Sequence, residues 1–256
     1  MSRKRDSSGF GGSVGNGRRS VLVLGIALGL ACGLGPSMTP AAASTNMNKP
    51  AIGSQYDFQC TASGGETRSL QWDVLAEDGD IITIGERTRD QSFWRELPYY
   101  LIGSTVALRR TAAQGRREMT FELGGFFSSG DFGGLRTLTV GQKFAAPVPE
   151  RANGLPVLDW KYSFQVEKAG RVDHAPVGEV EVYVILEQRE RGPYKSASRI
   201  IYAPAIGAPI AFNYVDNLGL EERCDLGAYR KPGEAAPRMK LDDMDKGAPP
   251  EPLPQS

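Results

Sequence analysis

The sequence is poor in the residues that most often carry enzyme chemistry. It contains one histidine, His174, and three cysteines. A single histidine excludes a metal centre built from several imidazoles, and a Ser-His-Asp site would have to form around the polar segment RVDHAP, which we interpret as a loop. Nucleophile-elbow, zinc-protease, phosphate-loop and dinucleotide-binding motifs are absent after residue 43. The sequence therefore predicts no catalytic residue, no cofactor and no metal site.

The chain also lacks an excess of charge of one sign. Lysine plus arginine and aspartate plus glutamate each number 30, so the formal net charge is zero. The first 43 residues hold five bases and one acid, which leaves the rest of the chain with a net charge of minus four. Nucleic-acid binding requires a basic surface. We therefore exclude nucleic acid as a partner.

One long apolar run is present, VLVLGIALGLACGLG, and it lies near the N-terminus. It follows a basic region and precedes TPAAAS, whose small residues Ala41 and Ala43 suit a signal peptidase. The run is too short and too rich in glycine for a permanent transmembrane span. We predict that residues 1–43 are a signal peptide and that the mature protein of 213 residues is periplasmic.

Two variants of this export signal stay open beside a general secretory signal. The sequence RRSVL at residues 18–22 loosely fits a twin-arginine signal. Lipidation at Cys32 is the second variant. It fits less well, because Gly29 stands three positions upstream, where lipoprotein signals carry a branched apolar residue.

The other two cysteines, Cys60 and Cys224, lie at opposite ends of the expected fold. In an oxidising compartment such a pair predicts one disulfide, which closes a very long loop and stabilises the fold by about 4 kcal/mol or more. Two separately buried thiols are the alternative. A redox-active pair is disfavoured, because the sequence contains no Cys-x-x-Cys motif.

Alternation of apolar and polar residues with a period of two dominates the mature chain. In WKYSFQVE, residues 160–167, the aromatic side chains and the valine share one face and the polar side chains share the other. This pattern is typical of half-buried strands, and Asp78-Gly79 between apolar runs predicts a tight hairpin turn. We predict an all-β domain over residues 48–230, built as a strongly curved antiparallel sheet or half-barrel. The proline-rich, charged tail over residues 231–256 is expected to be disordered.

Two segments of this domain echo each other. YYLIGSTVAL at 99–108 and IYAPAIGAPIAF at 201–212 share the pattern Ile-Gly-x-x-(Val or Ile)-Ala-(Leu or Phe). Further matches upstream extend the echo to about residues 56–108 and 162–212. Two related β-units explain these matches, and chance agreement is the alternative.

The glycines of the echo, Gly103 and Gly207, have a structural interpretation. Glycine permits a backbone conformation or a close approach that a side chain forbids, and here it precedes a further strand. Pro204 cannot donate to a sheet ladder, so it belongs to the same turn. Neither copy contains a nucleophile with an evident base, which argues against a catalytic signature.

The second half of the domain resembles a family of β-rich proteins. TVGQKF at 139–144, WKYSFQV at 160–166, PVGEVEVYVI at 176–185 and IYAPAIG at 201–207 follow one another in the chain. In this order the motifs resemble uncharacterised envelope proteins of Gram-negative bacteria with a Tyr-x-Pro-x-x-Gly motif. The resemblance implies a curved antiparallel sheet of the kind seen in periplasmic lipoprotein carriers, and it carries no catalytic residue.

Aromatic residues supply the remaining functional signal. They gather in a proline-bent segment and in a glycine-rich loop, namely Phe93, Trp94, Tyr99, Tyr100, Phe126, Phe127 and Phe132. Beside a curved sheet they would line a groove for an apolar ligand, or they would fill the core. We predict a lid, so that Trp94→Ala or Phe127→Ala releases bound ligand with little change in stability. As core, Trp94→Ala would cost roughly 3–5 kcal/mol.

Three classes of function follow from the sequence. The leading hypothesis is an exported, non-catalytic envelope protein that binds a lipid or another apolar ligand, or an envelope component, in the concavity of the sheet. A structural or assembly partner of an envelope protein is the second. The third is a hydrolase of envelope polymers that uses two carboxylates, with Asp131, Asp159 and Asp216 as candidates.

Overall fold

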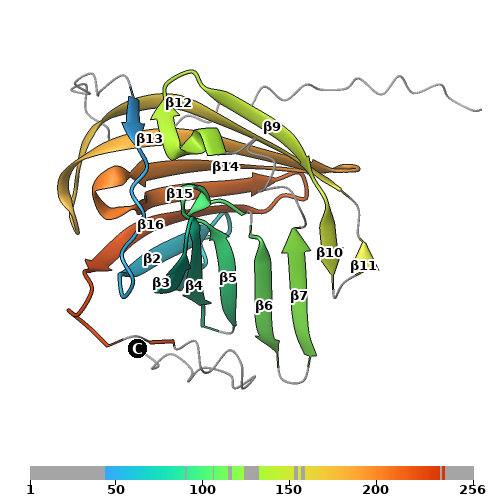
Figure 1. Ribbon diagram of the computed structural model, residues 1–256, viewed down its shortest axis with the longest axis horizontal. Coiled ribbons are helices and arrows are strands. Elements are labelled where there is room, and N and C mark those ends of the chain that lie inside the picture. Colours follow the sequence, from blue (N-terminus) through green and yellow to red (C-terminus); the bar gives the residue numbers. More distant parts are fainter. Residues whose placement is uncertain are drawn as a thin grey trace, which may run out of the picture. The chain divides into compact units, whose positions relative to one another are not determined.

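A computed structural model describes residues 44–89, 91–105, 107–114, 117–123, 133–152, 155–156, 159–236 and 238–239. The predicted signal peptide and residues 124–132, which hold Phe126, Phe127, Phe132 and Asp131, lie outside these residues. In the described part the chain forms strands and short 3-10 turns (Figure 1). No helix in that part is long and apolar enough to cross a membrane. The predicted all-β class is confirmed.

Fourteen of the strands form one antiparallel sheet, hydrogen-bonded in the order β11-β10-β7-β6-β5-β4-β3-β2-β16-β15-β14-β13-β12-β9. Their bounds are β2 (Gln55–Ala62), β3 (Thr67–Asp78), β4 (Ile81–Arg87), β5 (Ser92–Pro98), β6 (Arg109–Gln114), β7 (Arg117–Leu123), β9 (Lys143–Val148), β10 (Glu150–Ala152), β11 (Leu155–Pro156), β12 (Trp160–His174), β13 (Gly178–Arg191), β14 (Tyr194–Ala203), β15 (Ala208–Asp216) and β16 (Glu221–Arg230). A separate pair joins β1 (Ser44–Asn46) to β8 (Thr137–Thr139). Short 3-10 turns lie at η1 (Tyr99–Leu101), η3 (Gly133–Arg136) and η4 (Pro204–Ile206).

The sheet curves so that β12–β15 arch over β2–β5 (Figure 1). In the described residues its two ends are linked through the chain, without a ladder of hydrogen bonds between them. β9 pairs with β12 and β10 pairs with β7, and only Pro149 separates β9 from β10. Glu150 strengthens this link, because its carboxylate accepts hydrogen bonds from Trp160 Nε1 at 2.7 Å and from Arg191 Nη1 at 2.9 Å. The sheet is therefore curved and open, as predicted.

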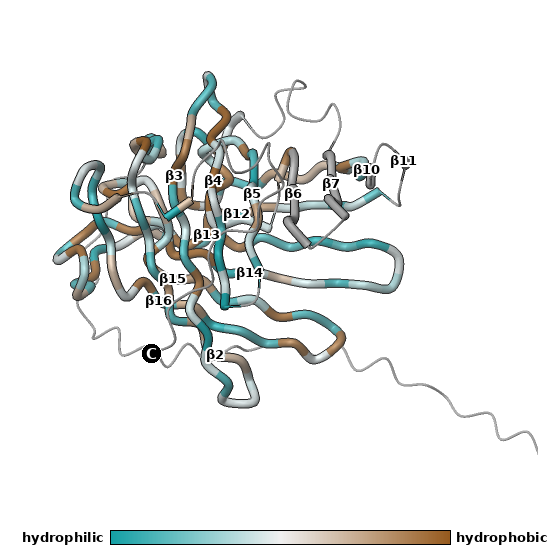
Figure 2. Tube along the Cα trace, turned by 90° about the horizontal axis from the view of Figure 1, so that it is seen from below, coloured by the Kyte–Doolittle hydropathy of each residue, from teal (hydrophilic) through white to brown (hydrophobic). Residues whose placement is uncertain are grey.

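Apolar and polar residues alternate along the strands (Figure 2). The apolar core lies on the inner face of the sheet. Its largest fully buried side chains include Tyr56, Phe58, Tyr183 and Tyr202. The 3-10 turns add Leu101, Leu135 and Ile206.

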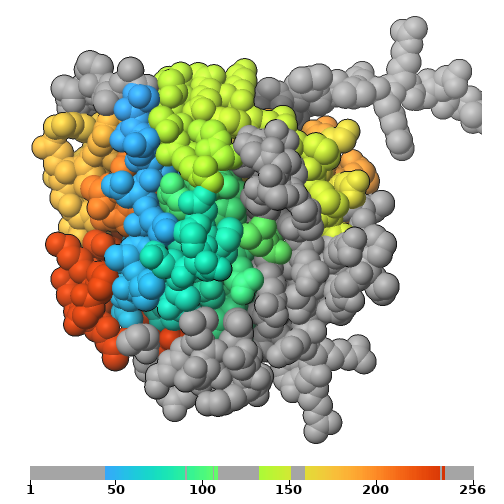
Figure 3. All heavy atoms as spheres, viewed as in Figure 1, coloured from blue at the N-terminus to red at the C-terminus, as the bar shows by residue number. Residues whose placement is uncertain are grey.

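Residues 44–50, which we call the N-terminal strap, lie beside the segment that holds η3 and β8 (Figure 3). β1 of this strap pairs with β8, and the Met47 N–H donates to the Arg136 carbonyl at 2.7 Å. Behind this strap, the hydroxyls of Tyr56 and Tyr202 donate to the carbonyls of Ile206 and Asn48. One end of the concavity is thus filled by packed side chains.

The echoed segments have the same local structure at their ends. Each runs from a strand through a 3-10 turn to a glycine with positive φ, +87° at Gly103 and +64° at Gly207. Their beginnings differ. Two strands, β12 and β13, cover the second copy up to Arg189, whereas three strands, β2 to β4, cover the first copy up to Arg87.

Gly207 is required for two reasons. Its φ lies in the left-handed region, and a Cβ atom there would come within 2.8 Å of the Pro50 nitrogen and 2.9 Å of the Asn48 carbonyl oxygen. Gly219 also has a positive φ, +94°, but a Cβ atom added there would have no other atom within 4 Å. We expect Gly219→Ala to cost about 1–2 kcal/mol, from backbone strain alone.

Gly207→Ala should lower the free energy of unfolding by about 1–3 kcal/mol more, because the N-terminal strap must move. Urea denaturation of both variants measures the difference. Equal losses would show that the strap yields without cost.

The chain beyond β16 returns to the sheet. Asp73 of β3 is buried and accepts hydrogen bonds from the Arg238 side chain at 2.7 and 2.9 Å and from the backbone N–H groups of Arg238 and Met239. Met239 is buried over Gly85, where a Cβ atom would meet its sulfur at 2.7 Å. These residues belong to the segment predicted to be disordered, and in the structure they cover the outer face of β3 and β4.

Candidate functional site

The inner face changes character from one end to the other. Cross-strand pairing places Arg95 of β5 opposite Ile84, and Glu86 of β4 opposite Trp72. On the facing side of the sheet, Glu187 and Arg189 of β13 follow Ile185 at every second position. Residues that are directly opposite share a face of the sheet. The inner face is thus apolar near the 3-10 turns and charged at its other end.

A cavity of about 210 Å³ lies at the charged end. Strands β3, β4, β5 and β13 to β16 line it, together with the segment after Gly103. Its charged side chains are Arg68, Glu86, Arg95, Arg189 and Glu222. The rings of Trp72 and Phe212 also line it and stack at a centroid distance of 5.8 Å. Burying charge is costly unless the charge is paired. Five charged side chains gathered on the inner face therefore mark this cavity as the candidate functional site.

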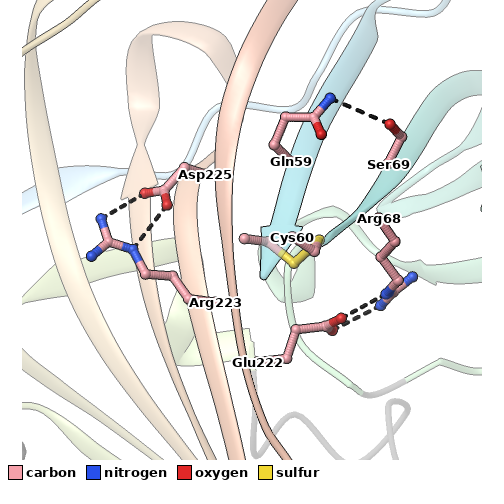
Figure 4. The surroundings of a disulfide bond; sticks show 8 residues. Gln59, Cys60, Arg68, Ser69, Glu222, Arg223 and Asp225 are labelled. Carbon is pink, nitrogen blue, oxygen red and sulfur yellow. Dashed lines mark hydrogen bonds and ion pairs between the residues drawn. A yellow bond between two sulfur atoms is a disulfide. The ribbon is translucent and has the colours of Figure 1, made fainter. Parts of the chain in front are cut away.

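Two ion pairs build the wall of the cavity. Arg95 donates from Nη1 to Glu86 Oε2 at 2.8 Å and from Nη2 to the Ser104 carbonyl at 2.9 Å, and both charged side chains are buried. Arg68 binds both carboxylate oxygens of Glu222, at 2.6 and 2.8 Å. This second pair lies beside the Cys60–Cys224 disulfide (Figure 4). The carboxylates of the wall are therefore already occupied by arginines.

Glu187 is buried next to the cavity, where Thr105 and Ser104 hold its carboxyl group. Its carboxyl group accepts hydrogen bonds from the Thr105 hydroxyl and from the Thr105 backbone N–H, the latter at 3.1 Å. Burial raises the pKa of Glu187 well above its ordinary value, although the contacts with Thr105 and the charge of Arg189 oppose that shift. Burial of Glu187 thus disfavours its charged form.

Arg189 differs from the other arginines of the cavity because its direct partners are neutral. It donates to the Ser196 hydroxyl at 2.7 Å and to the Tyr214 hydroxyl at 3.1 Å. Its guanidinium also lies over the rings of Trp160, Tyr194 and Tyr214, at 5.0 to 5.8 Å from their centres. Within the described residues no carboxylate forms an ion pair with it.

The raised pKa of Glu187 leads to a testable pH dependence. A carboxyl group whose pKa is higher in the folded protein takes up a proton on folding, so stability falls as pH rises from the ordinary value of 4.5 through the folded value. Glu187→Gln removes this titration. We expect the variant to gain stability relative to the wild type as pH increases over that interval, in urea denaturation at a series of pH values. Glu190→Gln, an exposed position on the same strand, should show no such gain.

The aromatic residues singled out in the sequence do not surround one groove. Phe93 pairs with Glu86 on the inner face, whereas Trp94 pairs with Gly85 on the outer face. Tyr99 and Tyr100 lie in η1, with Lys49 and Arg136 over their respective rings. None of these four residues lines the 210 Å³ cavity. Phe126, Phe127 and Phe132 lie outside the described residues.

The candidate carboxylates are not brought together either. Asp159 is exposed, and Asp216 stabilises the turn between β15 and β16 by accepting hydrogen bonds from the backbone N–H groups of Leu218 and Leu220. Partial desolvation would raise the pKa of Asp216, but these hydrogen bonds and those from Tyr194 and Tyr214 lower it overall. Asp131 lies outside the described residues.

Two further features of the sequence have structural explanations. Cys60, Glu222 and Cys224 have the ligand types of a metal site within 4.8 Å of one another, but both sulfurs are joined in the disulfide. His174 ends strand β12, opposite Gly178, rather than lying in the predicted loop. Burial lowers the pKa of His174.

The sequence did not point to the charged residues of the cavity. One signal was available in GEVEVYVILEQRER, because Glu187 and Arg189 continue the alternation of Tyr183 and Ile185, a second apolar face. Charged residues at such positions face the core. For Arg68, Glu86 and Arg95 the strand pattern carries no comparable signal.

A second hollow, of about 430 Å³, runs along β9, β12 and β13. Ala145 in its lining is exposed. It is an open feature of the surface, and the charged side chains of its lining, Lys161 and Glu190, are exposed as well.

No protein-family model matches the chain, and no curated protein matches it. Among solved structures, a candidate lipoprotein of Parabacteroides distasonis ATCC 8503 is 7% identical with a TM-score of 0.37, and the alignment covers 73% of this chain and 99% of that one. The hypothetical lipoprotein YmcC of Escherichia coli K12 is 9% identical with a TM-score of 0.41, over 74% of this chain and 90% of that one. Both TM-scores are low, so neither similarity supports a functional conclusion.

Proposed function

We propose that the chain is an exported, non-catalytic protein of the bacterial cell envelope that binds a small polar ligand in the inner-face cavity. The predicted signal peptide and the Cys60–Cys224 disulfide support export to an oxidising compartment. The observation that carries the binding function is the cavity itself, about 210 Å³ lined by five charged side chains on the concave face.

The sequence led us to expect an apolar ligand, whereas the polar lining of the cavity favours a polar one. The apolar end of the concavity is occupied by the side chains of the core and by the N-terminal strap, whereas the cavity lies among arginines and glutamates. Binding is favoured over hydrolysis because Glu86 and Glu222 are each committed to an arginine. A general acid and a general base would need carboxyl groups free to exchange protons with a substrate.

Native mass spectrometry of the protein purified from the periplasm tests this proposal. A mature mass that corresponds to cleavage after Ala43, with a bound species of low molecular mass, is the expected result. A co-purified protein would instead favour the assembly function. An empty monomer that also gains no mass from a periplasmic small-molecule extract would contradict ligand binding.

A further inference from the structure

Two buried hydrogen-bond donors at the cavity have no acceptor in the described part of the protein. They are the indole Nε1 of Trp72 and the guanidinium Nε of Arg95. Trp72 is 3% exposed and Arg95 is 9% exposed, and both line the cavity. Leaving a buried donor without an acceptor destabilises the fold, so such donors rarely lack a partner.

The side chains that carry these two donors lie close together. The guanidinium carbon of Arg95 lies 5.8 Å from the centre of the Trp72 ring. The other nitrogens of Arg95 are engaged by Glu86 and by the Ser104 carbonyl, which hold the guanidinium in a fixed orientation. Nε is therefore a rigid donor, and the neighbouring indole adds a second donor at the same wall.

The charges around the cavity leave an excess of positive charge. Arg68 and Arg95 are neutralised by Glu222 and Glu86 at 2.6 and 2.8 Å. Arg189, the third arginine in the lining, contacts hydroxyl groups and aromatic rings. Burial raises the pKa of nearby Glu187 and so disfavours its charged form, and burial raises the pKa of Tyr162 to about 12.

We infer that the cavity binds one anionic oxygen group, a carboxylate or a phosphate, with Trp72 Nε1 and Arg95 Nε donating to its oxygens and Arg189 supplying the opposite charge. The inference rests on the proposed function and names the ligand class. Hydrogen bonds from a charged donor to an anionic oxygen are among the stronger hydrogen bonds in proteins. A cavity of about 210 Å³ admits a small anion or the anionic end of a larger ligand.

The indole resonances of the three tryptophans provide a direct test. The full mature protein, labelled with ¹⁵N, is titrated separately with inorganic phosphate and with acetate, with sodium chloride as the ionic-strength reference. Single Trp→Phe variants assign the resonances. We expect the Trp72 indole to shift saturably with one anion or both, while the indole of Trp94, on the opposite face, stays in place. The anion that binds more tightly distinguishes a phosphate site from a carboxylate site.

Variants then assign the binding to these donors. Glu86→Gln with Arg95→Gln removes the buried pair together, so that no single charge is stranded, and calorimetry should show at least a tenfold loss of affinity for the anion. Trp72→Phe removes one donor while keeping an aromatic ring, and it should weaken binding as well. Arg223→Gln is the control, because Arg223 is exposed and paired with Asp225 away from the cavity (Figure 4).

The outcomes separate this inference from the proposed function. No saturable shift with either anion, or equal affinity in wild type and in a folded Trp72→Phe variant, would overturn it. A neutral ligand found by native mass spectrometry would also overturn it and leave the proposed binding function standing. If the double variant does not fold, the Trp72→Phe result decides.

Discussion

Reduction of the Cys60–Cys224 disulfide is expected to lower the free energy of unfolding by about 4–5 kcal/mol. The two cysteines are 164 residues apart in sequence and lie opposite each other on β2 and β16, with their Cα atoms 3.9 Å apart. The bond therefore joins the first strand of the sheet's N-terminal half to the last strand of its C-terminal half. Its loss frees a long loop in the unfolded chain and so raises the entropy of the unfolded state.

Two routes to this result check each other. Urea denaturation with and without a thiol reductant keeps both sulfur atoms in place and isolates the cross-link. Cys60→Ala with Cys224→Ala adds the loss of two fully buried sulfurs, so it should cost at least as much. A reduced protein that unfolds at the same urea concentration as the oxidised protein would show that the disulfide contributes no stability.

Trp94→Ala is expected to cost about 3–5 kcal/mol, the range of large-to-small changes in a core. Trp94 is 2% exposed on the outer face of β5, opposite Gly85. The same glycine lies beneath Met239 and beside Leu75. The large ring is thus part of a second packed layer that the C-terminal segment helps to cover, and its removal leaves a cavity there.

Urea denaturation of Trp94→Ala measures this loss, and Leu218→Ala is the matched control. Leu218 is 78% exposed in the turn after β15, so its truncation should change stability by no more than about 0.5 kcal/mol. A small loss of stability in Trp94→Ala, together with a loss of bound ligand, would support the lid that the sequence predicted. A large loss of stability with the ligand retained, the result that we predict, would show that Trp94 serves the core.

The strands themselves could be predicted because their signal is local. WKYSFQVE became the start of β12, and Trp160, Tyr162, Phe164 and Val166 are all buried, as their alternation indicates. The turn at Asp78-Gly79 joins β3 to β4, with Gly79 at φ +57°. Each of these features depends on neighbours a few residues away, so the pattern is legible in the sequence.

The binding site could not be predicted, because its contacts join distant parts of the chain. Arg68 and Glu222 are 154 residues apart, and Thr105 and Glu187 are 82 residues apart. Conversely, residues that are adjacent in sequence can lie on opposite faces of the sheet, as Phe93 and Trp94 do. These two residues were assigned to one groove, but neighbouring side chains of a strand point to opposite faces.

The sequence by itself determined the all-β class, through the period-two alternation of its strands, and it supplied one pair of cysteines for the folded domain. It also placed glycine at positions 103 and 207 of the echoed segments, and the backbone takes a positive φ at both. Only the tertiary structure decided which strands are neighbours and hence which charges meet. The pairing of β16 with β2, and the curvature that turns β13 toward β3 to β5, gather the arginines and glutamates around one cavity. Such contacts depend on long-range pairing and close packing, which the local pattern of residues does not encode.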